Sequence, residues 1–91
     1  MKAMAPPKIT VYSKAFCPYC VRAKALLTKK GVAFEEIPVE GKDELRTWLV
    51  EQTGQQTVPQ VFAGDRSLGG FSDLDALDRE GKLDPILRGE A

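Results

Sequence analysis

The only two cysteines of this 91-residue chain lie three positions apart, in the segment Cys17-Pro18-Tyr19-Cys20. A β-branched apolar run precedes the segment and a helical pattern follows it, so Cys17 is expected where a strand ends and a helix begins. Pro18 suits the first helical position, because its φ is fixed and its missing N–H would have no partner there. Cys17 is then the N-cap at an exposed helix start, where free N–H groups and the helix dipole favour the reactive thiolate. Cys20, one turn further in, is expected to stay protonated and still to reach the first sulfur.

Three other uses of such a cysteine pair have to be weighed. A structural disulfide usually closes a longer loop, where the gain in stability is larger. A zinc site needs four ligands, and the chain has no further cysteine and no histidine, so zinc could be held only between two chains. Inert buried thiols would need neither the proline between them nor Lys14 upstream. The residues therefore favour thiol–disulfide redox chemistry, and the lack of histidine excludes Cys–His proteases.

Length and charge narrow the class of protein. The length suffices for one compact domain. Lysine plus arginine and aspartate plus glutamate both number 13, so nothing indicates binding to nucleic acid or to a membrane surface. Residues 1–7 hold no apolar signal core, and no run reaches transmembrane length. We therefore expect a cytoplasmic or otherwise reducing location, where a Cys-x-x-Cys pair is more often catalytic than structural.

Hydrophobic periodicity predicts an α/β chain in the order βαβαββα, after a disordered lead-in at residues 1–7. We expect strands at residues 8–12, 32–39 and 66–68, and another within residues 57–63 with Pro59 at its start. Helices are expected at residues 18–30, 43–53 and from residue 72 up to Gly81. Ser72 to Asp75 have the spacing of a capping box, with Asp75 in place of the usual glutamate. Asp84-Pro85 is expected to cap a last helical turn. The first two strands and the helix between them predict a parallel, right-handed βαβ unit within a four-stranded mixed sheet.

Three segments resemble the glutaredoxin family. They are Cys17-Pro18-Tyr19-Cys20, Thr57-Val58-Pro59 and Gly69-Gly70-Phe71-Ser72-Asp73, and their mutual spacing is also similar to that of the family. The resemblance covers about residues 8–88. It implies a single domain with a thioredoxin-like fold, in which helices flank a four-stranded mixed sheet, and it points to the dithiol class. Phe16 and Ala63 depart from the family's pattern, and the bulk of Phe16 bears on which protein disulfides can dock.

A glutathione site is implied by this resemblance. Glutathione is a small peptide with two carboxylates and an ammonium, so its site needs cations, backbone donors and one acidic partner. Lys14 is expected to bind the glycyl carboxylate and to stabilise the Cys17 thiolate. Arg46 stands where the family places a carboxylate-binding glutamine or arginine. Read without the resemblance, each cation could equally be a solvated surface charge.

The remaining site residues also follow from the resemblance. The Val58–Pro59 bond is expected to be cis, so that Thr57 and Val58 offer backbone hydrogen bonds to a bound peptide. Gly70 precedes a helix N-terminus whose N–H groups, with those of Ser72 and Asp73, are expected to hold the γ-glutamyl carboxylate. Asp73 would also face the ammonium, and Tyr19 would lie beside the bound sulfur. Each feature also has an ordinary structural explanation. Pro59 could simply start a strand, Gly70 could belong to a capped turn, and Tyr19 could be a surface aromatic.

The predicted function is glutathione-dependent thiol–disulfide oxidoreduction with no metal. Cys17 attacks a protein disulfide or a glutathionylated protein, and Cys20 or a second glutathione resolves the mixed disulfide. Ribonucleotide reductase is one conceivable client, and a monomer is expected. Two alternatives stay open. One is a thioredoxin-like electron donor reduced by a flavoprotein reductase. The other is a carrier in which two chains and two glutathiones hold an iron–sulfur cluster through Cys17.

Overall fold

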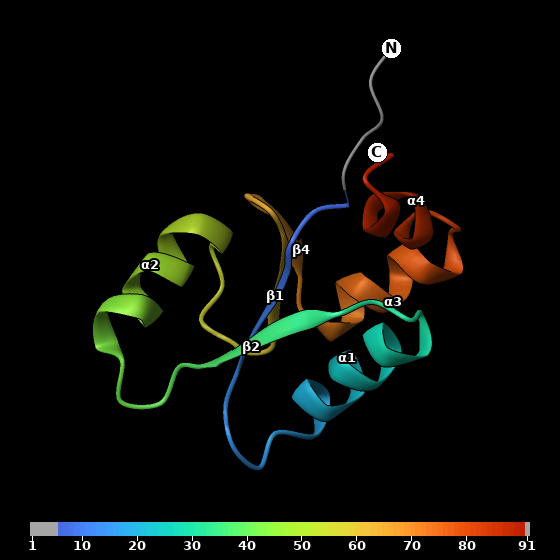
Figure 1. The fold of residues 1–91 in the computed structure, drawn as a ribbon. Helices are drawn as coiled ribbons and strands as arrows, with labels where there is room; N and C mark the ends of the chain where they lie inside the picture. The colour runs from blue at the N-terminus through green and yellow to red at the C-terminus, as the bar shows by residue number, and fades with distance from the viewer. Residues whose placement is uncertain (1–5, 91) are drawn as a thin grey trace.

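A computed structural model describes residues 6–90, and Figure 1 shows their arrangement. The elements within this range follow in the order β1 (Ile9–Ser13), α1 (Pro18–Lys29), β2 (Phe34–Pro38), α2 (Asp43–Thr53), β3 (Gln60–Ala63), β4 (Arg66–Gly69), α3 (Phe71–Arg79) and α4 (Leu83–Arg88). The predicted order is confirmed, and the expected last turn is the separate helix α4. Residues 1–5 of the expected lead-in lie outside the described residues.

The four strands form one mixed sheet in the order β2-β1-β3-β4, as predicted. The central strand β1 pairs in parallel with β2, to which α1 connects it, and antiparallel with β3. β4 completes the sheet antiparallel to β3. Both edge strands carry exposed charges, Glu35 and Glu36 on β2 and Arg66 on β4, which discourage pairing with the edge of another sheet.

Side chains alternate across the sheet, so each face has its own apolar core. On one face, Val11 packs with Leu27 of α1 and Leu74 of α3 in a buried cluster. On the other face, Leu49 of α2 packs against Phe62 of β3. Figure 1 shows the resulting layers, with α2 on one side of the sheet and α1, α3 and α4 on the other. The end of β1 leads directly into the Cys-x-x-Cys segment between these layers.

The second strand starts later than predicted, because the residues before it close the end of α1. Gly31 has a φ of 74°, the left-handed conformation expected of a residue just after a helix. The N–H of Val32 donates to the carbonyl of Leu27, so this N–H belongs to the helix end rather than to the sheet. The predicted strand 32–39 is therefore wrong at its start, and β2 begins at Phe34.

The third strand begins beside Pro59, as predicted. β3 starts at Gln60, directly after Pro59, which has no N–H to donate to a β-ladder. The Val58–Pro59 bond is cis, as predicted. The bounds predicted for the second helix are confirmed at Asp43–Thr53, whereas β1 lies one residue later than predicted.

The predicted cap of the third helix is wrong. α3 begins at Phe71, and its N-cap is Gly70 in an extended conformation, with φ of −86° and ψ of −167°. The N–H of Gly70 donates to the Asp73 carboxylate at 3.2 Å, so Asp73 has the role predicted for Asp75. Ser72 therefore lies inside the first turn. α4 likewise begins earlier than expected, at Leu83, which leaves Asp84 inside its first turn.

Candidate active site

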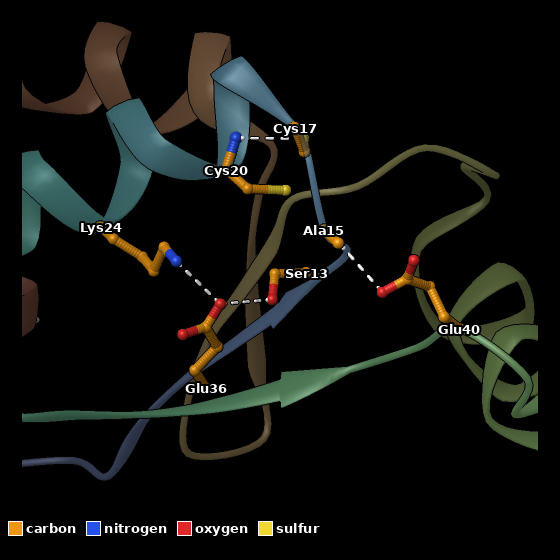
Figure 2. A network of polar contacts seen from close by, with 7 residues as sticks. All are labelled: Ser13, Ala15, Cys17, Cys20, Lys24, Glu36 and Glu40. Atoms are coloured by element: carbon orange, nitrogen blue, oxygen red, sulfur yellow. Dashed lines mark hydrogen bonds and ion pairs between the residues drawn. The ribbon is translucent and has the colours of Figure 1, made fainter.

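The first cysteine caps α1, as the sequence predicts. Cys17 is the N-cap in an extended conformation, and Pro18 follows at the first helical position. The N–H of Cys20 donates to the Cys17 sulfur at 3.2 Å, as Figure 2 shows. The sulfur thus receives one of the N–H groups that a helix start leaves without a backbone partner. This contact stabilises negative charge on Cys17 when the thiol ionises.

Both thiols are free, and Cys17 is more covered than the sequence suggests. The exposed fraction is 7% for Cys17 and 1% for Cys20. The expectation of an exposed position for Cys17 is therefore wrong. Its sulfur lies 3.9 Å from the Val58 carbonyl oxygen, in the segment before β3. Burial, followed by the hydrogen bond with Cys17, raises the pKa of the Cys20 thiol to about 11. Cys20 is therefore protonated at neutral pH, as predicted.

The segment Ala15-Phe16, which leads into Cys17, is bound by a residue that follows β2 and carries an exposed aromatic ring. The N–H of Ala15 donates to the Glu40 carboxylate at 2.9 Å. Phe16 has a φ of 55°, an uncommon conformation for a bulky residue, and its side chain is fully exposed. The ring therefore stands in solvent beside the reactive sulfur and is available to contact a large substrate.

A first cavity, of about 470 Å³, lies between the active-site segment and α2; we name it the α2 cavity. Lys14, Arg46, Thr57 and Val58 all line it, so the fold brings together residues up to 44 positions apart in the sequence. Within residues 6–90, neither Lys14 nor Arg46 forms an ion pair with a carboxylate. Both cations are therefore available to an anionic ligand.

A second cavity, of about 460 Å³, lies at the start of α3; we name it the α3 cavity. The other predicted glutathione contacts line it, namely Tyr19, Pro59, Gly70, Ser72 and Asp73. Thr57 and Val58 line this cavity as well as the α2 cavity, so the two cavities adjoin along this segment. All nine residues predicted to contact glutathione therefore line one continuous run of surface depressions.

The start of α3 is tightly built around glycine. Gly69 has a φ of 86°, and a Cβ at this position would collide with the Asp73 carboxylate. A Cβ on Gly70 would lie 3.2 Å from the Pro59 carbonyl oxygen. The first N–H groups of the helix can consequently approach a ligand without side-chain obstruction. Tyr19 lies nearby, with its ring 6.3 Å from that of Phe71.

Sequence reasoning missed the residues that hold the Thr57–Val58 segment. Gln55 lines both cavities. The side-chain amide of the buried Gln60 donates to the Gln55 side-chain oxygen at 2.8 Å and to the Thr57 carbonyl at 2.9 Å. The available signal was a polar residue directly after Pro59 in an otherwise apolar strand. Gln60 therefore fixes the shape of the segment that separates the two cavities.

A third cavity, of about 590 Å³, lies on the α1 and β2 side of the cysteines; we name it the thiol cavity. Both cysteines line it, together with Ser13, Lys24 and Glu36. Sequence reasoning also missed Lys24 and Glu36, although Lys24 stands one helical turn after Cys20. Figure 2 shows their contact beside the two cysteines.

Within residues 6–90, no group of three or more histidine, cysteine, aspartate or glutamate residues is placed to hold a metal ion. No helix there is long and apolar enough to cross a membrane.

Comparison with known proteins supports the redox assignment. The sequence model of the family Glutaredoxin matches residues 9–68. A glutaredoxin of Pseudomonas aeruginosa is 52% identical over 81 residues, which cover 89% of this chain and 96% of that protein. Glutaredoxin 3 of Escherichia coli is 48% identical over 80 residues, which cover 88% and 96%.

Solved structures agree with the sequence comparison. The solution structure of glutaredoxin from Brucella melitensis superimposes with a TM-score of 0.83 at 43% identity, covering 99% of this chain and 96% of that one. A buckwheat glutaredoxin–glutathione complex has a TM-score of 0.84 at 36% identity, covering 89% and 76%. The fold is therefore thioredoxin-like, as predicted. With its capped Cys17, its protonated Cys20 and these relatives, the chain belongs to the glutaredoxin family and is a thiol–disulfide oxidoreductase.

Proposed function

We propose that the protein is a dithiol oxidoreductase that depends on glutathione and reduces protein disulfides and glutathionylated proteins. The observation that carries the proposal is the pair of adjoining cavities that share Thr57 and Val58. One end offers the cations Lys14 and Arg46, and the other end offers the start of α3. A peptide with a carboxylate at each end matches this distribution of charge. The Cys17 sulfur lies 3.9 Å from the Val58 carbonyl, beside the middle of the site.

The chemistry follows from the different environments of the two thiols. The Cys17 thiolate attacks a disulfide, forms a mixed disulfide with one half and releases the other half as a thiol. For a protein disulfide, Cys20 then attacks the Cys17 sulfur and releases the substrate. The enzyme now carries an intramolecular disulfide between Cys17 and Cys20. For a glutathionylated protein, glutathione remains on Cys17, and a second glutathione takes it away as glutathione disulfide. Glutathione is thus a co-substrate, and the buckwheat glutaredoxin–glutathione complex supports this role by likeness.

A turnover assay tests the proposal. The purified, reduced protein is mixed with glutathione, a small mixed disulfide of glutathione and an excess of a glutathione-disulfide reducing system. We expect catalytic turnover that depends on both the protein and glutathione. Turnover that requires a flavoprotein thioredoxin reductase, and that glutathione cannot support, would contradict the proposal and favour the thioredoxin-like alternative.

The same purified protein also tests the alternative that the chain carries an iron–sulfur cluster. We propose a monomer and expect a colourless protein, because the Pro18-Tyr19 pair between the cysteines is typical of catalytic relatives. Anaerobic purification followed by size-exclusion chromatography and visible spectroscopy measures both properties. A dimer with persistent visible absorption, and without turnover in the assay, would identify the iron–sulfur alternative instead.

The two cations of the α2 cavity are expected to contribute differently. Replacing Arg46 by alanine should raise the KM for glutathione by about 1.5- to 5-fold, because an exposed ion pair is worth only about 0.2–1 kcal/mol. The rate of Cys17 alkylation should not change, since Arg46 does not line the thiol cavity. Lys14 lines both the α2 cavity and the thiol cavity. Lys14→Ala should therefore raise the KM for glutathione and also slow alkylation of Cys17 at neutral pH. Equal alkylation profiles for the wild type and Lys14→Ala would remove the second role of Lys14.

The chemistry of the active site defines the class of client proteins and the compartment in which the protein can work. We propose that clients are proteins with a disulfide or a glutathionylated cysteine accessible to the exposed Phe16 beside Cys17. Ribonucleotide reductase is one protein that would fit this description. We further propose a reducing compartment such as the cytoplasm, because a glutathione pool must return the protein to its dithiol form.

A further inference from the structure

The thiol cavity contains a hydrogen-bonded ion pair beside the resolving cysteine. The ammonium of Lys24 lies 2.9 Å from one carboxylate oxygen of Glu36, and the Ser13 hydroxyl donates to the same oxygen at 2.7 Å. Lys24 stands four residues after Cys20 on α1, so the two side chains share a face of the helix. Figure 2 shows Lys24 reaching from α1 to Glu36 on β2, next to Cys20. An ion pair and both thiols thus line one cavity.

The cation of Lys24 acts on Cys20 across this cavity, and the Glu36 carboxylate is paired with that cation. Burial, the hydrogen bond with Cys17 and the charge of Cys17 raise the pKa of the Cys20 thiol, whereas a hydrogen bond from the backbone of Lys14 and the charge of Lys24 lower it. The carboxylates that line the cavity are those of Glu36 and Glu40. Glu40 is engaged by the Ala15 N–H, whereas Glu36 is engaged by Lys24. Hydrogen bonds from Lys24 and Ser13 lower the pKa of Glu36, so its carboxylate stays ionised at neutral pH.

We propose that Lys24 and Glu36 are positioning residues that set how readily Cys20 ionises to resolve a mixed disulfide on Cys17. Lys24 favours the thiolate of Cys20, and Glu36 opposes it by holding and neutralising the Lys24 charge. The pair therefore acts mainly on the dithiol route, in which Cys20 resolves, and less on the first attack by Cys17, whose sulfur receives the Cys20 N–H. The proposal rests on the oxidoreductase activity of the family and does not require the glutathione site.

The controlled step is an ordinary thiol–disulfide exchange. Cys20 loses its proton to solvent, and its thiolate attacks the Cys17 sulfur. The new Cys17–Cys20 bond forms as the bond between Cys17 and the substrate sulfur breaks. The substrate sulfur leaves as a thiolate and takes a proton from solvent. The substrate gains two electrons and the enzyme's two thiols lose them. A cation beside Cys20 raises the fraction of thiolate at a given pH and so raises the rate.

A chromogenic disulfide separates the two steps in one experiment. Reduced protein is mixed rapidly with one equivalent of dithiobis(nitrobenzoate), which releases a coloured thiol at each exchange. The first release reports the attack by Cys17, and the second, unimolecular release reports the attack by Cys20. Burial is the largest cause that raises the pKa of the Cys20 thiol, and it persists when Cys17 is in a mixed disulfide, so the second rate in the wild type should rise with pH through the neutral and mildly alkaline range.

The two single variants should change the second rate in opposite directions. At neutral pH, Lys24→Gln should slow the second release by about 1.5- to 5-fold, and Glu36→Gln should accelerate it by a similar factor. The variant with both changes should return close to the wild type, because it removes the two charges together. Lys24→Arg keeps the cation and should retain the wild-type rate. In each variant the first release should change less than the second.

A neighbouring ion pair provides the matched control. Lys8 lies 2.8 Å from Glu35, which is next to Glu36 on β2, and neither residue lines the thiol cavity. Lys8→Gln and Glu35→Gln should leave both releases unchanged. The proposal is overturned if Lys24→Gln and Glu36→Gln both slow the second release, since that would indicate a purely structural tie. It is also overturned if neither variant changes that release, or if the first release changes equally.

Discussion

Replacing Cys17 by serine is expected to abolish all thiol–disulfide exchange, whereas Cys20→Ser should lose only part of it. Cys17 caps α1 and receives the Cys20 N–H at 3.2 Å, so no other thiol of the chain can begin the reaction as a stabilised thiolate. Cys20 has an exposed fraction of 1% and a pKa raised to about 11 by burial and by the hydrogen bond with Cys17. It should react only with a disulfide already formed on Cys17.

The decisive measurement is turnover of two substrate types by each variant. Cys20→Ser should keep most of its activity toward a glutathionylated protein, because a second glutathione can resolve the intermediate. It should lose most reduction of a protein disulfide, for which the intramolecular attack by Cys20 is required. A Cys20→Ser variant that is inactive toward glutathionylated substrates would show that the proposed glutathione site is wrong. Wild-type turnover of both substrates serves as the reference.

Replacing Gly69 by alanine is expected to damage both stability and glutathione binding. Gly69 has a φ of 86°, and an added Cβ would collide with the carboxylate of Asp73. The left-handed conformation alone should lower the free energy of unfolding by about 1–2 kcal/mol. Overpacking should add about 1–3 kcal/mol unless Asp73 moves. Movement of Asp73 would release the Gly70 N–H and disturb the start of α3, so the KM for glutathione should rise severalfold.

Gly64 offers a matched control for this prediction. It has a φ of 60°, in the turn between β3 and β4, and a Cβ there would meet nothing within 4 Å. Gly64→Ala should therefore show the conformational penalty without the collision and keep the wild-type KM. Thermal unfolding and glutathione kinetics of both variants provide the comparison. Equal losses of stability with an unchanged KM in both would refute the proposed link between Gly69, Asp73 and the ligand.

Much of the local structure could be predicted because neighbouring residues determine it. The helix start at Cys17-Pro18 depends on a fixed φ and on backbone donors within one turn. The bounds of α2 followed from its helical periodicity and from Gly54, which has a φ of 71° after the last turn. The predicted N-cap of α3 was wrong, because more than one set of residues near its start has the spacing of a capping box. Only the backbone geometry selects Gly70 over Ser72 as the N-cap.

The contents of the site depended on distant contacts, which spacing alone does not reveal. Motif resemblance supplied Lys14 and Arg46 as candidates, but the packing of α2 on the sheet brings both to one cavity. The ion pair of Lys24 with Glu36 was not predictable, because it requires the crossing of α1 over β2. By itself, the sequence determined the redox chemistry, through its two cysteines and their helix start. The tertiary structure alone decided the burial of these thiols and the charges around them, because long-range packing sets both solvent access and electrostatic neighbours.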